Sequence, residues 1–322
     1  MNNILITSAG KRVSLVKAFK TELEKYFPEG IIATVDANPQ LSAACHVADK
    51  FYKVPRLNAP NYIDELISIC KLNNISLIIP TIDTELLLLS ENAKKLLIEG
   101  VTPVISSVDL VTICGDKRLT HKFFESHGVK TAKEYLKTDY KLPLFIKPVD
   151  GSRSIDTFII LKKEDFRDNY FEDKKLMFLE YLDHNLYDEY TCDLYYGKDF
   201  KLKCVVPRRR IEVRDGEVNK GRTEKNSLIQ YVKKHLEFID GARGCLTVQF
   251  FKHKSEDTII GIEINPRFGG GFPLSYFAGA NYPKWIIQEY MLNQQIEPFD
   301  DWEDNLLMLR YDNEILIHGF KD

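Results

Sequence analysis

The sequence lacks the features that mark secreted, zinc-binding or membrane-spanning proteins. Its six cysteines form no Cys-x-x-Cys pair, and its seven histidines include no His-x-x-x-His pair. A disulfide framework or a zinc site is therefore not expected, and any metal here should have oxygen ligands. Apolar runs such as residues 86–89 are far shorter than the roughly 20 residues that cross a bilayer. We expect most of the thiols to be small buried side chains.

Neither sign of charge dominates the chain. Lysine and arginine total 44 and aspartate and glutamate 47, which gives a formal charge of −3 over 322 residues. Nucleic-acid-binding proteins usually carry a basic excess, so we expect neither nucleic acid nor a membrane as partner. Residues 1–4 contain no basic segment and no cleavage site of small residues, which predicts no signal peptide. The expected location is the cytoplasm.

Apolar strands and helices alternate in the first third of the chain. We expect strands over residues 3–7, 31–35 and 76–79, and amphipathic helices over residues 13–23 and 62–72. Strands that are apolar along nearly their whole length and separated by helices are typical of a parallel, doubly wound sheet. Ligands of such sheets bind at the carboxyl ends of the strands. The sequence thus predicts an α/β domain with a binding edge after these strands.

Strands follow one another more closely after about residue 106. Helices are predicted over residues 117–127 and 228–239, and a hairpin over residues 246–264. The other predicted strands cover residues 144–147, 157–161, 177–182, 189–196 and 201–207. Few crossover helices separate them, which indicates an α+β unit built on antiparallel sheet.

A carboxylate, an amide and an arginine are closely spaced near residue 265. Glu263 and Asn265 are two residues apart on a predicted strand, so both side chains leave the same face. Their oxygens suit Mg²⁺, and Gln249 on the neighbouring strand could reach the same face. Arg267 follows at the strand end, where its planar fork can hold a phosphoryl group. An exposed strand edge with a glycine-rich turn would give the same pattern, and the sequence alone leaves both open.

Two lysines lie where a strand ends and a helix begins. Lys147 ends the predicted strand 144–147, and Lys117 begins the predicted helix 117–127. A helix N-terminus offers backbone N–H groups to a phosphate, and a lysine beside it adds positive charge. A surface lysine with its stem along apolar side chains is the alternative for either residue alone.

Three consecutive arginines, Arg208 to Arg210, form a local positive cluster. The near-neutral total charge argues against nucleic acid, so neutralisation of a polyphosphate or a carboxylate is the functional interpretation. A solvated charged face is the alternative. The strand-to-loop segment 178–182, followed by Glu189 and Asp193, could offer backbone groups to an adenine edge and carboxylates to ribose hydroxyls, although two surface acids at a strand end would look the same.

The order of these segments resembles the ATP-grasp superfamily: a lysine after Gly-Asp, a lysine before a Gly/Ser turn, Glu-x-Leu at a hinge, and Gln…Glu-x-Asn-Pro-Arg. It is most similar to the short carbamoyl-phosphate-synthase-large-subunit-like ATP-grasp ligases. Their Thr-Ser-Ala-Gly-basic-Arg, Pro-Thr-Ile-Asp and Asn-Pro-Arg-Phe-Gly-Gly-Gly segments match residues 7–12, 80–83 and 265–271. The resemblance covers nearly the whole chain. The chain has room for one ATP-grasp unit, so carbamoyl phosphate synthesis itself is not predicted.

The resemblance implies a role for each matching position. The residues implied in ATP binding are Lys117, Lys147, Ser152, Glu180, Tyr181, Leu182 and Glu189. Those implied as magnesium ligands are Gln249, Glu263 and Asn265. Arg267 is implied in stabilising the transferred phosphoryl group and the acyl phosphate, and we expect one of Arg208, Arg209 and Arg210 to assist it. The turn after Lys147 departs from the family pattern, because it has one glycine where relatives often have two or three.

The other substrates are expected where the strand ends of the first domain meet the glycine-rich turn. The residues concerned are Ser8, Gly10, Asp83, Gly269, Gly270 and Gly271. We expect an α/β and α+β fold: a Rossmann-like pre-ATP-grasp domain over residues 1–105, followed by ATP-grasp subdomains over residues 106–185 and 186–322.

The implied activity is ATP-dependent ligation of a small carboxylate to an amine, or to a thiol, through an acyl phosphate. ATP and Mg²⁺, or Mn²⁺ in its place, are the implied cofactors, and a homodimer is left open. A non-catalytic nucleotide sensor is one alternative. An NAD(P)-dependent oxidoreductase is another, but Gly-x-Gly-x-x-Gly is absent and the second half of the chain would have no explanation.

Overall fold

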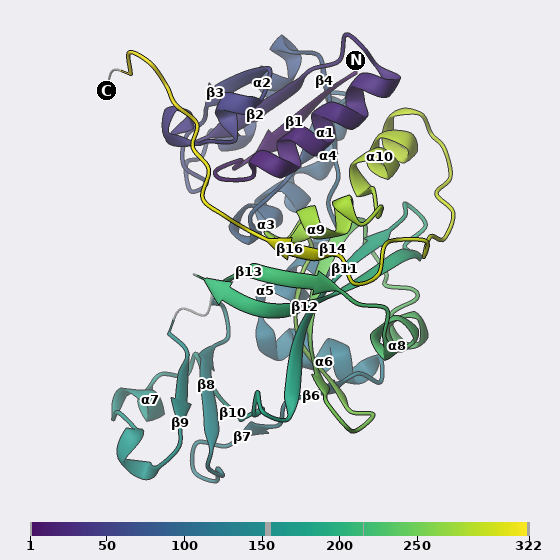
Figure 1. The fold of residues 1–322 in the computed structure, drawn as a ribbon. Coiled ribbons are helices and arrows are strands. Elements are labelled where there is room, and N and C mark those ends of the chain that lie inside the picture. The colour runs from purple at the N-terminus through teal and green to yellow at the C-terminus, as the bar shows by residue number, and fades with distance from the viewer. Residues whose placement is uncertain (1, 152–155, 215, 321–322) are drawn as a thin grey trace.

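The computed structural model describes residues 2–151, 156–214 and 216–320 and arranges them around three β-sheets (Figure 1). The first sheet has the order β3-β2-β1-β4-β5, and all of its pairs are parallel. Its strands are β1 (Asn3–Thr7), β2 (Ile32–Asp36), β3 (Lys50–Lys53), β4 (Ile75–Ile79) and β5 (Thr102–Pro103). The parallel sheet expected from the alternating apolar segments is confirmed.

Helices cover both faces of this sheet. They are α1 (Val13–Tyr26), α2 (Tyr62–Leu72), α3 (Asp83–Glu91) and α4 (Ala93–Ile98), with short 3₁₀ turns η1 (Pro39–Leu41) and η2 (Cys45–Val47). Ile4 and Ile6 of β1 pack in one core with Phe19 of α1, whereas Leu5 packs in the opposite core with Leu66 of α2. Successive strand side chains point to opposite faces, so a strand that is apolar throughout needs both covers.

The second sheet is small and antiparallel, with the order β7-β10-β8-β9. Its strands are β7 (Glu134–Tyr135), β8 (Leu144–Pro148), β9 (Phe158–Ile160) and β10 (Leu176–Glu180), accompanied by η3 (Lys163–Asp165) and α7 (Asn169–Glu172). Its own cluster of apolar side chains holds Ile146 and Phe178 fully buried. In Figure 1 it forms the teal unit at the end of the molecule opposite the N-terminal domain.

The third sheet has the order β16-β13-β12-β11-β14-β15-β6 and is antiparallel except for the β15–β6 pair. Its strands are β6 (Lys130–Thr131), β11 (Tyr187–Tyr196), β12 (Leu202–Arg214), β13 (Glu217–Thr223), β14 (Gly244–His253), β15 (Ile259–Asn265) and β16 (Leu307–Leu309). The helices that follow or cover it are α5 (Val108–Gly115), α6 (Lys117–Ser126), α8 (Ser227–His235), α9 (Phe272–Phe277), α10 (Tyr282–Ile286) and the π turn η4 (Ile287–Met291).

Each face of the third sheet joins a different core. Leu110 of α5, Phe124 of α6 and Val232 of α8 pack on one face. On the other face, Phe272 and Trp285 share a core with side chains of the N-terminal sheet. The helices before residue 127 therefore pack with the third sheet rather than the second. The boundaries at residues 105 and 185 remain a prediction.

The predicted strand 201–207 is longer than expected, because β12 continues to Arg214 and pairs with β13. Pro207 lies inside this strand, although proline cannot donate to a ladder. The carbonyl of Pro207 accepts the N–H of Glu224, just past the last residue of β13. The missing N–H therefore faces the point where the ladder stops, and the strand tolerates it. The predicted helix 228–239 is shorter than expected and ends at His235.

All six cysteines are free thiols, buried except for the partly buried Cys114, as expected of small apolar side chains. Within residues 2–151, 156–214 and 216–320, none of the helices has both the length and the apolar composition needed to cross a membrane.

Candidate active site

A cleft of about 710 Å³ lies between the three sheets. The predicted site residues that line it are Asp83, Lys117, Lys147, Glu189, Arg210, Gln249, Glu263, Asn265, Arg267, Gly269, Gly270 and Gly271. They come from α3, α6, β8, β11, β12, β14, β15 and the turn before α9. The fold thus brings most of the predicted residues to one place, although 188 positions separate Asp83 from Gly271 in the sequence.

The three predicted metal ligands form one contiguous group. Gln249 of β14 lies opposite Glu263 of β15 in the antiparallel register, which the sequence alone did not fix. Glu263 Oε1 accepts hydrogen bonds from Gln249 Nε2 at 2.7 Å and from Asn265 Nδ2 at 3.0 Å. Rotation of each amide about its last torsion would turn its oxygen toward the carboxylate. The donor set of one carboxylate and two amide oxygens fits Mg²⁺.

Lys147 is a buried cation that faces this group. Lys147 is 6% exposed, and burial lowers its pKa to about 8, although Glu263 opposes this shift. Among the described residues, no hydrogen-bond acceptor is assigned to its ammonium. A buried, unpaired ammonium is costly for the fold. Its position in a cleft therefore indicates that an anionic ligand is its partner.

Lys117 begins α6 beside this lysine and donates to the carbonyl of Gly151. Burial lowers its pKa as well, and Glu263 opposes the shift. Asp116 caps the helix by accepting the N–H groups of Arg118 and Leu119, so the Gly-Asp-Lys segment is fixed by local capping. Buried His121 lies one turn further, where burial, reinforced by Lys147 and Lys117, lowers its pKa to about 4. His121 is therefore neutral near pH 7.

Arg267 joins the metal strand to the N-terminal domain. Its Nη2 donates to Asp83 Oδ2 at 2.6 Å, and its Nη1 donates to the carbonyl of Phe268 at 3.3 Å. Its Nε is buried without a hydrogen-bond partner in the described part of the chain. An orphaned guanidinium N–H at a cleft wall is well placed to receive an oxyanion.

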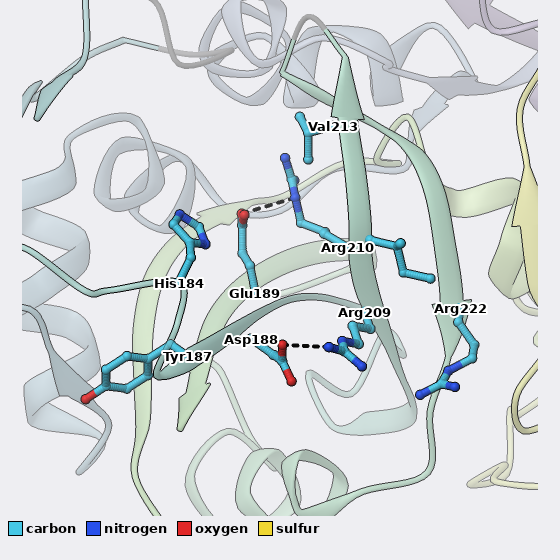
Figure 2. A pocket seen from close by; sticks show the side chains of 9 residues that line it. His184, Tyr187, Asp188, Glu189, Arg209, Arg210, Val213 and Arg222 are labelled. Atoms are coloured by element: carbon cyan, nitrogen blue, oxygen red, sulfur yellow. Dashed lines mark hydrogen bonds and ion pairs between the residues drawn. The ribbon is translucent and has the colours of Figure 1, made fainter. Parts of the chain in front are cut away.

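The consecutive arginines separate by strand alternation. Arg210 lines the cleft as well as a neighbouring pocket of about 460 Å³, and its Nε lies 3.1 Å from Glu189 Oε1. Arg209 lines the neighbouring pocket but not the cleft, and it binds Asp188 at 2.8 Å. Figure 2 shows the two arginines turned toward these different carboxylates. Successive residues of a strand point to opposite faces, so Arg210 rather than Arg209 is placed beside the cleft. A role for either arginine in assisting Arg267 stays a prediction.

Arg208 lines the cleft, but most of its guanidinium is used inside the protein. It forms two hydrogen bonds with the fully buried Asp193, at 2.7 and 2.9 Å. Ser275 also donates to Asp193, at 2.6 Å. A side-chain β-carbon at Gly271 would lie 2.1 Å from Arg208 Nη1. Glycine is thus required at 271 by a buried ion pair, whereas the sequence assigned it to the substrate.

Gly270 has a similar neighbourhood. A β-carbon there would lie 2.7 Å from Arg12 Nη1 and 2.8 Å from the Glu217 carboxylate. The sequence analysis assigned no role to either Arg12 or Glu217. Arg12 and Glu217 are far apart in the chain, and β13, which carries Glu217, was not predicted as a strand. The signal that could have pointed to Arg12 was the pair of basic residues after Gly10.

Several predicted residues lie away from the described cleft wall. Ser8 Oγ donates to the buried Glu85 at 2.8 Å, and the Gly10 N–H donates to Asp36 at 3.1 Å, so neither group points to a ligand. Leu182 packs against Ala132 and Ile260. Their substrate and hinge roles remain predictions.

The predicted hinge begins at Glu180, whose backbone N–H donates to the carbonyl of Lys133 at 2.9 Å. Tyr181 follows it and is half-buried. The cleft near this hinge is lined by the apolar side chains of Phe145, Phe251 and Ile262. Ser152, predicted to contact phosphate, lies outside the described residues.

Two family models match the chain in succession. The model described as "PylC-like, N-terminal domain" matches residues 4–105, and "ATP-grasp in the biosynthetic pathway with Ter operon" matches residues 172–308. The chain belongs to the ATP-grasp superfamily. The finer resemblance to the carbamoyl-phosphate-synthase-like branch remains a prediction.

Known proteins resemble the chain in part of the sequence or in the fold. A D-alanine–D-alanine ligase B of Clostridium perfringens is 27% identical over 106 residues, which is 28% of this chain and about a third (34%) of that relative. The biotin carboxylase domain of a Hydrogenobacter thermophilus 2-oxoglutarate carboxylase, solved with magnesium ADP and bicarbonate, matches with a TM-score of 0.71, 14% identity, and coverage of 95% of this chain and 73% of that one.

An L-amino acid ligase of Bacillus licheniformis matches with a TM-score of 0.68 and 14% identity, covering 90% of this chain and 74% of that one. The predicted fold, a Rossmann-like domain followed by an ATP-grasp unit, is confirmed. At these identities the structural likeness defines the fold and leaves the substrates open.

Proposed function

We propose that the chain is an ATP-dependent ligase that joins a small carboxylate to an amine, or to a thiol, through an acyl phosphate and releases ADP and phosphate. The observation that carries this proposal is that three kinds of side-chain group line one cleft: phosphate-binding cations, metal ligands and an arginine for the acyl phosphate. The buried Lys147, the half-buried Lys117, an oxygen-ligand group and an arginine with a free N–H face the same space. The ligases among the similar proteins support it.

The nucleotide fits the side of the cleft where β8 of the second sheet meets β14 and β15 of the third. Phe145, Phe251 and Ile262 offer apolar surfaces for a flat ring, and Lys117 and Lys147 offer positive charge for the phosphates. Burial raises the pKa of Glu189, but the nearby Arg210 opposes this shift and favours the charged carboxylate. That carboxylate can accept hydrogen bonds from ribose hydroxyls. Gln249, Glu263 and Asn265 would hold Mg²⁺, or Mn²⁺, which supplies Lewis-acid neutralisation of phosphate oxygens.

The chemistry follows from charge placement rather than from a covalent enzyme intermediate. A carboxylate oxygen of the substrate attacks the γ-phosphorus, a C–O–P bond forms, and the bond from the γ-phosphorus to ADP breaks. Arg267 then faces the acyl phosphate with its free Nε. The amine attacks the acyl carbon, the acyl C–O bond breaks, phosphate leaves and the amine loses its proton. The residues contribute positioning and charge neutralisation, which dominate catalysis of phosphoryl transfer.

Two alternatives use only part of this arrangement. A non-catalytic nucleotide sensor would need the lysines and the apolar walls but not Glu263, Asn265 and Arg267 together. A nicotinamide oxidoreductase would bind at the β1 and β2 ends, where the Gly10 N–H and the Asp36 carboxylate are already paired with each other. A ligase would use the lysines and apolar walls as well as Glu263, Asn265 and Arg267.

The test is ADP release measured across a panel of carboxylates and amines with Mg²⁺. We expect release that requires one carboxylate and one amine (or thiol) together, with the coupled product seen by mass spectrometry. ATP binding without substrate-dependent ADP release across the panel would favour the sensor, and oxidation of added NADH in its own arm would favour the oxidoreductase. Light scattering after gel filtration tests the homodimer, which we propose from the dimeric state of the H. thermophilus carboxylase domain.

A further inference from the structure

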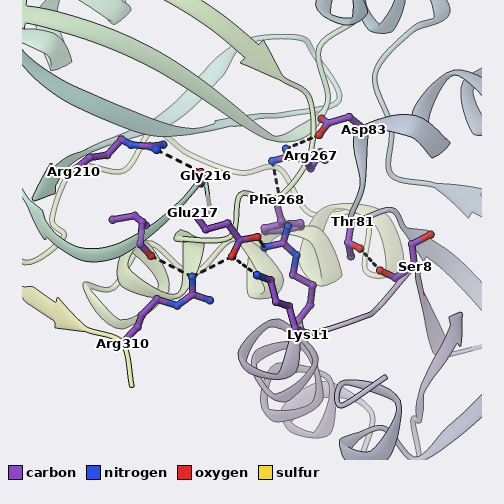
Figure 3. Close-up of polar contacts among 12 residues, drawn as sticks. Ser8, Lys11, Thr81, Asp83, Arg210, Gly216, Glu217, Arg267, Phe268 and Arg310 are labelled. Atoms are coloured by element: carbon purple, nitrogen blue, oxygen red, sulfur yellow. Dashed lines mark hydrogen bonds and ion pairs between the residues drawn. The ribbon is translucent and has the colours of Figure 1, made fainter. Parts of the chain in front are cut away.

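Three basic side chains surround one carboxylate, that of Glu217, which lines the cleft. Glu217 of β13 lies 3.2 Å from Lys11 Nζ, 3.2 Å from Arg310 Nη1 and 3.6 Å from Arg12 Nη1. Figure 3 shows Lys11 and Arg310 converging on Glu217, with the Arg267–Asp83 pair nearby. We call Lys11, Arg12 and Arg310 the basic wall. The proposed function gives it no role.

Arg12 is the least satisfied member of the basic wall. Its side chain is 15% exposed, and its ion pair with Glu217, at 3.6 Å, is longer than a hydrogen bond. Its guanidinium donates no hydrogen bond to any side chain or carbonyl in the part of the chain that the structure describes. Arginine has several N–H donors and no acceptor, so burying it without acceptors is costly. Burial is the main reason why its pKa is lowered, and Arg267 and Arg310 act in the same direction.

The local charge is also unbalanced. Lys11, Arg12, Arg310 and Arg267 are four cations, and they share the two carboxylates of Glu217 and Asp83. The helix α1 begins immediately after Arg12 with no side-chain cap and no acidic residue in its first turn. The positive end of the helix dipole therefore adds to the excess charge. An anion with one or two negative charges would restore the balance.

Arg12 can reach such an anion because it lines the same cleft as the metal group. Gly270 lies against it, so the backbone of the glycine-rich turn also approaches this position. The reacting carboxylate must lie near Glu263 and Arg267, where the γ-phosphate is expected. Arg12 lies against Gly270 and Glu217 rather than within the metal group, so it would contact a different part of a bound substrate.

We infer that Arg12 binds a non-reacting anionic group, a carboxylate or a phosphate, carried by one of the two ligase substrates. The inference rests on the proposed function and deepens it by naming the substrate class. Either the acid is a diacid (or a phosphorylated acid), or the amine carries an acidic group. A planar guanidinium with free N–H groups matches the paired oxygens of both anions.

The kinetic experiment compares Arg12→Gln and Arg12→Lys with Lys17→Gln, a charge change on the exposed face of the same helix. Each substrate of an active pair is assayed beside a neutral analogue in which the non-reacting acid is an amide. Arg12→Gln should raise KM for the anionic substrate at least tenfold and leave KM for its neutral analogue and for ATP within twofold. Arg12→Lys should show a smaller rise, and Lys17→Gln none. The substrate whose KM responds identifies the source of the anion.

A binding experiment separates failure of this inference from failure of the proposed function. Malonate and inorganic phosphate are titrated calorimetrically into the full chain with Mg²⁺ and a non-hydrolysable ATP analogue in excess. Saturable binding that Arg12→Gln abolishes and Lys17→Gln retains supports the anion site even if no ligation is found. Ligation with equal KM changes for anionic and neutral substrates, a rise in KM for ATP alone, or anion binding unchanged by Arg12→Gln overturns it.

Discussion

The guanidinium of Arg267 donates to the carboxylate of Asp83 across 2.6 Å, although 184 residues separate the two in the sequence. Asp83 is the first residue of α3 in the N-terminal domain, and Arg267 follows β15, the strand that carries Glu263 and Asn265. This ion pair is partly buried, with side-chain exposures of 14% for Arg267 and 35% for Asp83. The N-terminal domain therefore positions the arginine that we propose to face the transferred phosphoryl group.

Removing this contact should impair the chemical step more than nucleotide binding. We expect Asp83→Asn to lower kcat roughly 10- to 100-fold, because a mispositioned Arg267 loses its alignment with the acyl phosphate. The dissociation constant for ATP, measured by calorimetry, should stay within about threefold. Asp257→Asn, an exposed change in the β14–β15 turn, is the control. Equal losses of kcat and ATP affinity would mean that Asp83 acts on the nucleotide instead.

Lys147 should make ATP binding depend on pH. Its pKa is about 8 in the folded protein, and the phosphates require its charged form. Affinity should be flat below pH 8 and fall above it by up to about tenfold per unit, until the pKa of the bound state is reached. Lys147→Met should weaken ATP binding at pH 7 by roughly 10- to 100-fold and flatten this profile. Calorimetry from pH 6.5 to 9.5 measures both, and wild-type affinity in the variant would contradict a phosphate contact.

The same substitution should stabilise the ligand-free protein. Because the folded-state pKa of Lys147 is lowered, the folded protein bears the full cost of the buried charge below pH 8. That cost shrinks as the pH rises from 8 to the ordinary lysine value of about 10.4. Lys147→Met should therefore raise the free energy of unfolding by about 1–3 kcal/mol at pH 7, and by less at pH 9.5. Urea unfolding at both values measures this, with Lys17→Met as the exposed control. A destabilised variant would show that Lys147 has a partner in the fold.

Much of the N-terminal fold could be predicted because its strands are apolar along their length, which only a sheet covered on both faces explains. β13 could not, because its sequence from Glu217 to Thr223 is largely polar and Val218 is its one apolar side chain. Its place is decided by pairing with β12, which is itself longer than the predicted strand 201–207. Both errors concern the same edge of the third sheet.

Within the site, residues of one strand were easier to predict than residues that meet across domains. The two-residue spacing of Glu263 and Asn265 fixed their common face. The same rule separates Arg208 and Arg210 from Arg209, but applying it required knowing that the strand continues. The approach of Arg12 to Gly270 joins two domains, and no local pattern encodes it.

The buried pair of Arg208 and Asp193 should contribute strongly to stability. Arg208 is 2% exposed and Asp193 is fully buried, so Asp193→Asn leaves a buried guanidinium without its counter-charge. We expect the free energy of unfolding to fall by about 3–5 kcal/mol in urea titrations. Asp188→Asn is the matched control, because its ion pair with Arg209 joins the same two strands at exposures of 23% and 37% and should cost less than about 1 kcal/mol. Equal losses in the two variants would contradict the assigned burial.

Glu263 should matter for turnover far more than for nucleotide binding. Glu263→Gln keeps the size of the side chain and its contact with Gln249 but removes the one negative charge in the ligand group. We expect kcat to fall at least about 100-fold, because charge on the transferred phosphoryl group is no longer neutralised in place, while ATP affinity changes only a few fold. Raising Mg²⁺ or substituting Mn²⁺ should recover part of the rate.

The charge of Glu263 also opposes the lowering of the pKa of Lys147 and of Lys117 by burial. In Glu263→Gln the decline of ATP affinity with pH should therefore begin at a lower pH than in the wild type, which a merely structural defect would not produce. Glu256→Gln, in the exposed turn of the same hairpin, should change neither the rate nor the pH profile. Normal turnover of Glu263→Gln at millimolar Mg²⁺, with an unshifted pH profile, would show that this strand face does not hold the metal.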